Sequence, residues 1–168
     1  FISISDPDIL EKNINFLKLN KDKFINPLNG YDEEKIDQTI EIKQSSTKFK
    51  IGYAGTIYGF QKLEMYLNGL EKLISQKKLN NKEIESIFIG VNYKIEQKNR
   101  ILNHKKKLNE FINTTDRISH FDTLKYLKKC NILLLLCDDK HIALPAKLFE
   151  YFGMDRKIIV VKNDHDVV

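Results

Sequence analysis

The stretch NILLLLC, residues 131–137, is apolar from Ile132 to Cys137 without a single alternating polar position. A strand with one face in water alternates apolar and polar residues, whereas a parallel strand that is covered on both faces reads as an unbroken apolar run. The run is also far shorter than the about 20 residues that span a bilayer. We therefore interpret 131–137 as a central strand of a parallel sheet.

Segments with strand and helix patterns alternate on both sides of this central run. The predicted strands are 49–55, 84–90, 117–121, 131–137 and 156–161. The predicted helices are 60–78, 94–112, 122–129 and one that opens at Pro145, with Leu148, Phe149 and Phe152 on its buried face. Strictly alternating strands and helices with apolar strands predict an α/β fold with a doubly wound parallel sheet.

The residues before this alternation have a different character. FISIS (1–5) alternates like a short strand, a helix pattern follows over 6–19, and a turn-rich segment leads to the polar stretch EIKQSSTK (41–48). We expect two units, which are the tail of a preceding domain with its linker (1–48) and a Rossmann-like domain (49–168). Because the chain starts at Phe1 and both ends lie next to strand-like runs, we expect a fragment of a longer polypeptide whose second domain is incomplete.

Composition and charge exclude some classes of function. The chain has 168 residues, 42% hydrophobic and 30% charged, which is typical of a globular domain. The net charge of +5 comes almost entirely from lysine, and the cluster Lys105–Lys107 has no interleaved aromatic residues, so we expect no nucleic-acid partner. Cys130 and Cys137 are expected to be reduced and buried. No Cys/His cluster has metal-ligand spacing, so we expect no metal.

Ligands of such sheets bind outside the carboxyl ends of the strands. The strand 49–55 ends in AGTIYGF, where Gly55 and Gly59 allow close backbone approach and a helix N-terminus follows, which could hold an anion. The segment is neither G-x-G-x-x-G nor a P-loop, so a purely structural role for these glycines is an equal alternative.

The stretch LPAKLFEYF (144–152) places Lys147 in the first turn of a helix, where the helix dipole disfavours a cation. A phosphate bound there would offset the unfavourable interaction between the lysine and the helix dipole, because its negative charge is attracted to both the ammonium and the helix N-terminus. Glu150, one turn further, could accept hydrogen bonds from the paired hydroxyls of a ribose. The alternative is a solvent-exposed pair that contributes about 0.2–0.5 kcal/mol. The residues alone do not decide between the two.

Four segments, taken in order, resemble the retaining family 4 glycosyltransferases of GT-B architecture, in particular their nucleotide-sugar-binding C-terminal half. FISIS is similar to the last strand of the family's N-terminal domain, and FINPLNGYDEEKI is similar to its PNG-x-D segment. FKIGYAGTIYGFQKLE resembles the first strand and glycine loop of the donor domain. The segment from LKYLKKCNILLLLCDD to LPAKLFEYFGMDRKIIVV resembles the family's strand and P-x-KLFEY helix.

The resemblance implies that this chain is one half of a GT-B architecture, preceded by a remnant of the N-terminal, acceptor-binding half. It implies that Glu150 holds the donor ribose, that Gly55 and Thr56 approach the diphosphate, and that the loop at His120 borders the nucleobase. The donor-binding residues implied are Gly55, Thr56, Lys62, His120, Phe121, Lys147, Leu148 and Glu150. Catalytic acceptor-side residues would lie in the N-terminal half, and neither a metal nor a cofactor is expected besides the sugar-nucleotide substrate.

The chain departs from the family pattern at three places. Ile142 stands where many members carry the first glutamate of an E-x7-E pattern, Thr56 stands where an arginine is common, and GMDRK replaces AAGKP. These departures leave the identity of the donor open.

The function implied is that of a bacterial, hexosyltransferase-like enzyme in polysaccharide or glycoconjugate biosynthesis, which transfers sugar to a sugar or lipid-linked acceptor. We expect a cytoplasmic location, with peripheral association at the inner face of the membrane compatible with the full-length protein. The fragment alone is expected to bind nucleotide weakly without transferring sugar. The alternatives are a GT-B-like sugar-nucleotide epimerase and a noncatalytic nucleotide-binding Rossmann module. Sugar, base, acceptor, linkage and oligomeric state are not given by the sequence.

Overall fold

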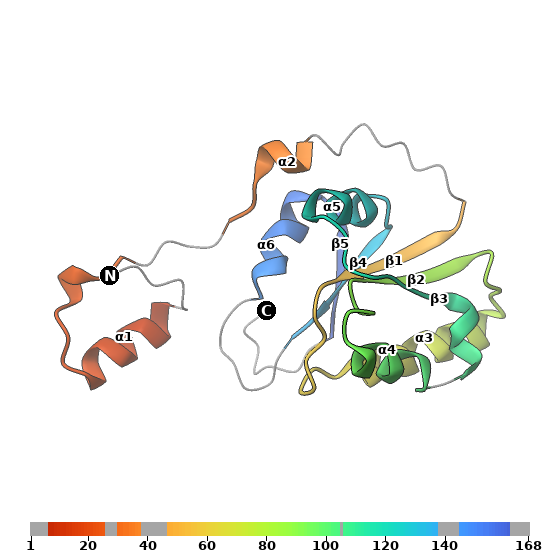
Figure 1. Cartoon of the computed structure of the whole chain (residues 1–168), viewed down its shortest axis with the longest axis horizontal. Coiled ribbons are helices and arrows are strands. Elements are labelled where there is room, and N and C mark those ends of the chain that lie inside the picture. The colour runs from red at the N-terminus through yellow and green to blue at the C-terminus, as the bar shows by residue number, and fades with distance from the viewer. Residues whose placement is uncertain (1–6, 26–29, 38–46, 105, 138–144, 162–168) are drawn as a thin grey trace.

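The structure is a computed structural model that describes residues 7–25, 30–37, 47–104, 106–137 and 145–161. Five parallel strands form one sheet in the order β3-β2-β1-β4-β5 (Figure 1). The strands are β1 (Phe49–Ala54), β2 (Ile84–Ile89), β3 (Ile112–Thr114), β4 (Ile132–Leu136) and β5 (Lys157–Val161). The helices are α1 (Pro7–Phe16), α2 (Glu33–Asp37), α3 (Leu63–Lys77), α4 (Ile95–Leu102), α5 (His120–Lys128) and α6 (Ala146–Gly153), with 3-10 turns η1 (Lys21–Lys23) and η2 (Lys106–Phe111).

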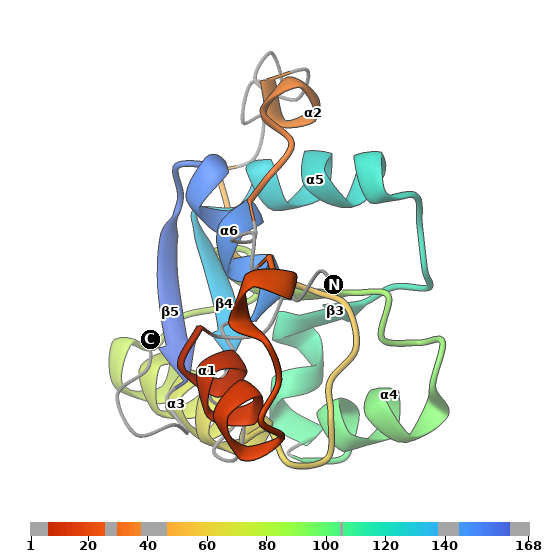
Figure 2. The ribbon, with the colours of Figure 1, turned by 90° about the vertical axis from the view of Figure 1, so that its left-hand side faces the viewer.

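Helices cover both faces of the sheet, α3 and α4 on one side and α5 and α6 on the other (Figure 2). The central strand β4 serves both layers, because Leu134 and Leu136 belong to the core under α3 while Leu133 and Leu135 belong to the core under α5 and α6. This double burial explains the unbroken apolar run in the sequence. The fold is therefore the Rossmann-like, doubly wound α/β fold that the sequence predicts.

The strand expected at 117–121 is wrong, and so is the second half of the helix expected at 94–112. The helix α4 ends at Leu102, and the third strand is Ile112–Thr114, which pairs in parallel with β2 from Ser86↔Ile112. Ser119 instead caps α5, since its Oγ accepts a hydrogen bond from the backbone N–H of Asp122 at 3.0 Å. The segment 117–119 is therefore a loop at the carboxyl edge of the sheet.

The buried face of α6 also differs from the expected one. Leu148 is buried as predicted, but Phe152 is 63% exposed and Phe149 is only partly buried. Tyr151 takes the core position instead, and its hydroxyl donates to the backbone oxygen of Leu134 at 3.3 Å. Pro145 lies at the N-cap rather than at the first helical position.

The N-terminal segment contains the predicted helix α1, which stands apart from the sheet (Figure 1). The strand expected at 1–5 and most of the linker expected at 41–48 lie outside the described residues. Ile36 of α2 is buried in the core under α5 and α6, and Tyr31 lies against Gly153 at the end of α6. The segment 30–37 therefore packs against the helices α5 and α6 of the Rossmann-like domain. The expected domain boundary at residue 48 stays a prediction.

Neither Cys130 nor Cys137 forms a disulfide, and both are buried, as predicted. Cys130 lies beneath β1, so close that a Cβ on Gly52 would stand 2.6 Å from its sulfur. Burial raises the pKa of the Cys130 thiol to about 12. No helix within the described ranges is both long and apolar enough to cross a membrane.

Candidate functional site

A cleft of about 360 Å³ lies at the carboxyl ends of β1 and β2, where ligands of such sheets bind. Its lining residues come from the loops after β1, β2 and β3 and from α5 and α6. They are Ala54, Gly55, Thr56, Ile89, Gly90, Arg117, Ile118, His120, Thr123 and Glu150. The cleft therefore combines two glycine turns with the guanidinium of Arg117, the carboxylate of Glu150 and the imidazole of His120.

The glycine turn after β1 forms the floor of the cleft. Gly55 has a φ of 99°, a conformation that residues with a side chain rarely adopt, and its N–H donates to the oxygen of Ile89 at 3.0 Å. The Tyr53 hydroxyl donates to the backbone oxygen of Thr56 at 2.7 Å and so holds the residue that follows Gly55 in place. Gly90, with a φ of 81°, makes the corresponding turn after β2. The two glycines have no side chains and therefore leave room for a ligand close to the backbone.

Lys147 reaches this turn from the first turn of α6. Its Nζ donates to the backbone oxygen of Ala54 at 3.0 Å and lies 4.0 Å from the centre of the Tyr53 ring, a cation–π contact. A Cβ on Gly55 would stand 3.6 Å from the same Nζ. Burial lowers the pKa of Lys147 to about 8, against the opposing effect of the Glu150 charge. The ammonium group is thus largely desolvated beside the glycine turn.

Glu150, one turn further along α6, lines the same cleft. Its Oε1 lies 2.8 Å from Nε2 of His120, the first residue of α5, and the imidazole N–H donates because a carboxylate only accepts. The Glu150 and His120 side chains are 34% and 55% exposed. The pair is therefore accessible from the cleft.

The structure brings five of the eight predicted donor-binding residues together. Gly55, Thr56, His120 and Glu150 line the cleft, and Lys147 lies beside it. The other three lie outside the lining. Lys62 is exposed at the start of α3, Phe121 lies under the Lys125 ammonium group at 4.1 Å, and Leu148 is buried in the core. That any of the eight binds a donor stays a prediction.

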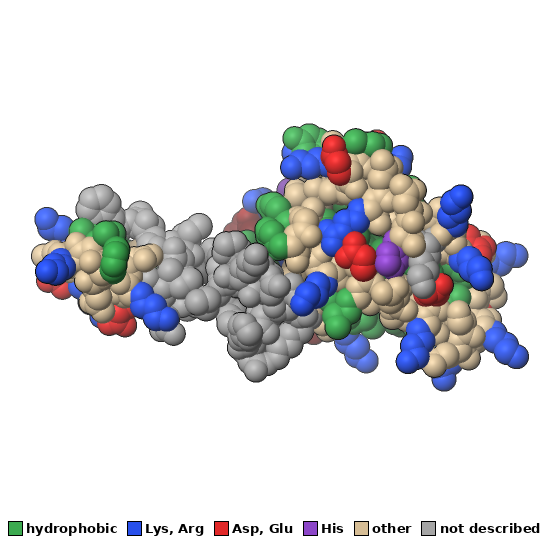
Figure 3. All heavy atoms as spheres, turned by 90° about the horizontal axis from the view of Figure 1, so that it is seen from below, with side chains coloured by type: hydrophobic (Ala, Val, Ile, Leu, Met, Phe, Trp, Pro, Cys, Tyr) green, Lys and Arg blue, Asp and Glu red, His purple; other side chains and the backbone are tan. Residues whose placement is uncertain are grey.

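Sequence reasoning missed Arg117, whose position was assigned to a strand. Its guanidinium carbon lies 3.7 Å above the centre of the Tyr93 ring, and its side chain lines the cleft beside Gly90. On the face of the molecule shown in Figure 3, lysine and arginine side chains are dispersed, with some acidic side chains between them. Among the described residues, no group of three or more His, Cys, Asp or Glu side chains is placed to hold a metal ion.

No model of a known protein family matches the chain, and no curated protein matches it either. Among solved structures, it is similar to a glycosyltransferase from Rickettsia africae ESF-5, with a TM-score of 0.67 and 14% sequence identity. The match covers 95% of this chain and 43% of the glycosyltransferase chain. The two proteins thus share a fold, and this chain spans less than half the length of that neighbour.

Proposed function

We propose that the chain is the donor-binding half of a glycosyltransferase and that its cleft binds a nucleoside diphosphate sugar. The observation that carries the proposal is that Lys147 and Glu150, one turn apart on α6, both reach the carboxyl edge of the sheet at the Gly55 turn. A cation and a hydrogen-bond acceptor at this spacing match a diphosphate and a ribose, which adjoin each other in every nucleoside diphosphate. The fold shared with a glycosyltransferase supports the same assignment.

In this proposal Lys147 and the N-terminus of α6 face the diphosphate. The negative charge that develops on the departing diphosphate during sugar transfer is then stabilised by the ammonium and by the backbone N–H groups, without a metal ion. Glu150 accepts hydrogen bonds from the ribose hydroxyls, and His120 orients the carboxylate. The base lies toward Gly90 and Ile118.

The finer assignments belong to the same proposal. The enzyme is a retaining, hexosyltransferase-like member of family 4 with GT-B architecture, and it acts in bacterial polysaccharide or glycoconjugate synthesis in the cytoplasm. Catalysis requires a further domain, which also supplies most of the acceptor site, so that residues 1–168 alone bind nucleotide without transferring sugar. Sugar transfer by the 168-residue chain alone would refute this division of labour.

Thermal unfolding in the presence of uridine, guanosine or adenosine diphosphate tests the donor site. A nucleotide at 100 times its dissociation constant is expected to stabilise the wild-type chain by about 2.7 kcal/mol. Glu150→Ala is expected to lose most of this stabilisation. Glu110→Ala, which removes an exposed carboxylate before β3, serves as the matched control and is expected to retain it.

Equal stabilisation of the wild-type and Glu150→Ala proteins would remove Glu150 from the donor site. Failure of all three diphosphates to stabilise the wild-type chain would overturn the proposed function as a whole.

A further inference from the structure

The loop between β1 and α3 carries two aromatic side chains into solvent. Tyr58 is 53% and Phe60 is 43% exposed, and their rings are parallel to within 4° with centroids 5.3 Å apart. At that separation the two rings are stacked with an offset. A Cβ on Gly59, between them, would meet no atom within 4 Å, so the space around the loop tip is open.

Two buried glutamines hold the backbone of this loop in place. Gln97 of α4 accepts a hydrogen bond from the N–H of Ile57 at 3.1 Å. Gln61 accepts from the N–H of Tyr58 at 3.0 Å and donates to the oxygen of Leu136, at the end of β4, at 2.8 Å. Buried amides with satisfied hydrogen bonds fix a local conformation, because each bond broken inside the protein is costly.

Arg100 of α4 completes the support. Its guanidinium donates to the backbone oxygen of Tyr58 at 2.9 Å and to that of Gln61, and it pairs with the Glu64 carboxylate of α3. Hydrogen bonding to Arg100 lowers the pKa of Glu64, so the carboxylate is ionised at neutral pH. The loop is therefore held by α3, α4 and β4 at once, while the rings at its tip stay exposed.

We propose that the Tyr58–Phe60 pair is a stacking platform for a sugar ring of the acceptor. The inference rests on the proposed function. One face of a pyranose presents C–H groups with partial positive charge, which suit the negative face of an aromatic ring. A loop that is already fixed loses little conformational entropy when the sugar binds.

The distance from the cleft supports an acceptor rather than an unrelated ligand. Thr56 lines the cleft and Tyr58 follows two residues later, so the platform starts within about 7 Å of chain from the donor site. This is about the length of one sugar residue. An acceptor stacked on the rings would therefore lie near a donor sugar bound at the Gly55 turn.

Aromatic NMR resonances of the 168-residue chain, titrated with maltotriose, cellotriose or chitotriose, test the platform. At least one trisaccharide is expected to shift the Tyr58 and Phe60 resonances in a saturable manner. The double variant Tyr58→Ala/Phe60→Ala is expected to bind that trisaccharide at least tenfold more weakly and to keep its stabilisation by nucleoside diphosphate. Tyr126→Ala, which removes another exposed tyrosine, is the matched control and should bind normally.

The outcomes separate this inference from the proposed function. If no trisaccharide shifts the two resonances, or if Tyr126→Ala weakens binding as much as the double variant, the platform is overturned while nucleotide binding can still stand. If saccharide binding follows Tyr58 and Phe60 but no nucleotide binds, the donor site fails and the platform survives as a sugar-binding surface. Loop-dependent binding to phosphatidylcholine/phosphatidylglycerol vesicles in place of saccharide would assign the rings to a lipid surface and overturn the inference.

Discussion

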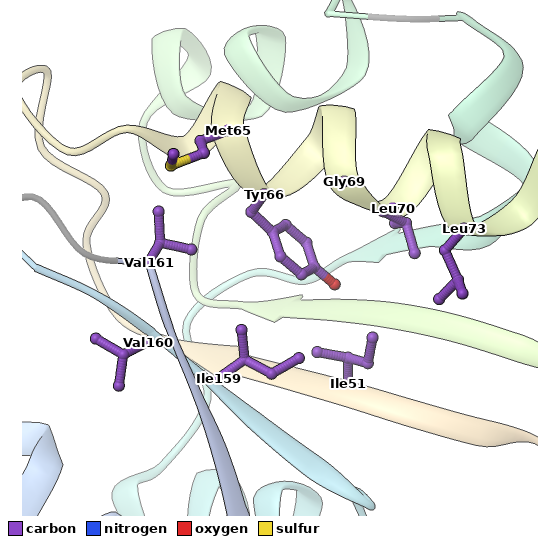
Figure 4. Close-up of a pocket in the computed structure, with 9 residues that line it drawn as sticks. All are labelled: Ile51, Met65, Tyr66, Gly69, Leu70, Leu73, Ile159, Val160 and Val161. Carbon is purple, nitrogen blue, oxygen red and sulfur yellow. The ribbon is translucent and has the colours of Figure 1, made fainter.

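The cleft at the carboxyl edge can be compared with a second hollow, an apolar groove on the α3 face of the sheet (Figure 4). The groove has a volume of about 430 Å³, against about 360 Å³ for the cleft. Ile51 and Ile159 point from the sheet toward α3 across it. Its lining residues are Ile51, Met65, Tyr66, Gly69, Leu70, Leu73, Ile159, Val160 and Val161.

The two hollows differ in the origin of their walls. The groove is built from the middle of α3 and from β1 and β5, where most backbone polar groups bond within the helix and the sheet, so mainly apolar atoms face the space. Tyr66 carries the one hydroxyl among the described residues that line it, and that hydroxyl bonds to Ser86. The cleft is built from the ends of elements, where helix termini and glycine turns leave polar groups available. Volume alone therefore does not indicate which hollow suits a polar ligand.

The largest effect is expected for a substitution in the groove wall. Leu70→Ala removes a buried side chain and should lower the free energy of unfolding by about 2–5 kcal/mol, because the cavity is only partly refilled. Denaturant unfolding measures this loss. Leu73→Ala, one turn further and exposed, is the matched control with a smaller cost. If the groove has only a structural role, both variants should also bind nucleotide with the affinity of the wild-type chain.

The converse effect is expected at the cleft. Lys147→Met removes the ammonium beside the Gly55 turn and should weaken binding of the tightest nucleoside diphosphate by about 1.5–3 kcal/mol, the range for hydrogen bonds to charged groups. Calorimetric titration measures the change. Lys72→Met on the exposed side of α3 should bind like the wild-type chain. Equal affinities of the two variants would contradict the role of Lys147.

The same lysine predicts a pH dependence. Its pKa of about 8 means that the ammonium is charged at pH 7 and mostly neutral at pH 9. The contribution of Lys147 to anion binding is therefore present below pH 8 and lost above it, and the share of charged Lys147 falls about tenfold between pH 7 and 9. Wild-type affinity should decline over this interval more than that of Lys147→Met. Parallel pH profiles would show that other groups titrate.

The smallest effect is expected at Gly69, which lies in the middle of α3 and lines the groove. A Cβ there would meet nothing within 4 Å, so Gly69→Ala should stabilise the helix by about 0.5–1 kcal/mol. Thermal unfolding measures the gain, and nucleotide affinity should not change. A loss of stability would mean that the groove tolerates less volume than its dimensions indicate.

Much of the sheet could be predicted because its central strands are buried on both sides. β1, β2, β4 and β5 stand out as apolar segments, whereas β3 has only three residues, Ile112–Thr114, too few to show a period. The error there moved a strand onto Arg117 and hid this residue from the expected site. The sequence signal that was missed is an N-cap: Ser119 is followed three residues later by Asp122, whose backbone N–H donates to the serine hydroxyl.

The candidate site was predictable where it depended on position in one helix. Lys147 and Glu150 are placed at the carboxyl edge by the start of α6 alone, which the sequence marks with Pro145. The support of the β1 loop could not be predicted in the same way. Arg100 and Gln61 are 39 residues apart, and their contact exists only once α4 has packed beside the loop. Buried amides such as Gln61 look like surface residues in the sequence.

The two buried thiols offer a way to follow unfolding of the molecule. The chain contains no tryptophan, so the most common optical signal of unfolding is missing. A thiol with a pKa of about 12 is almost entirely protonated at pH 8, and only the thiolate reacts with alkylating reagents. The side chains of Cys130 and Cys137 are both buried, so labelling of either should wait for the sheet to open, and its rate would time that opening for every variant discussed above.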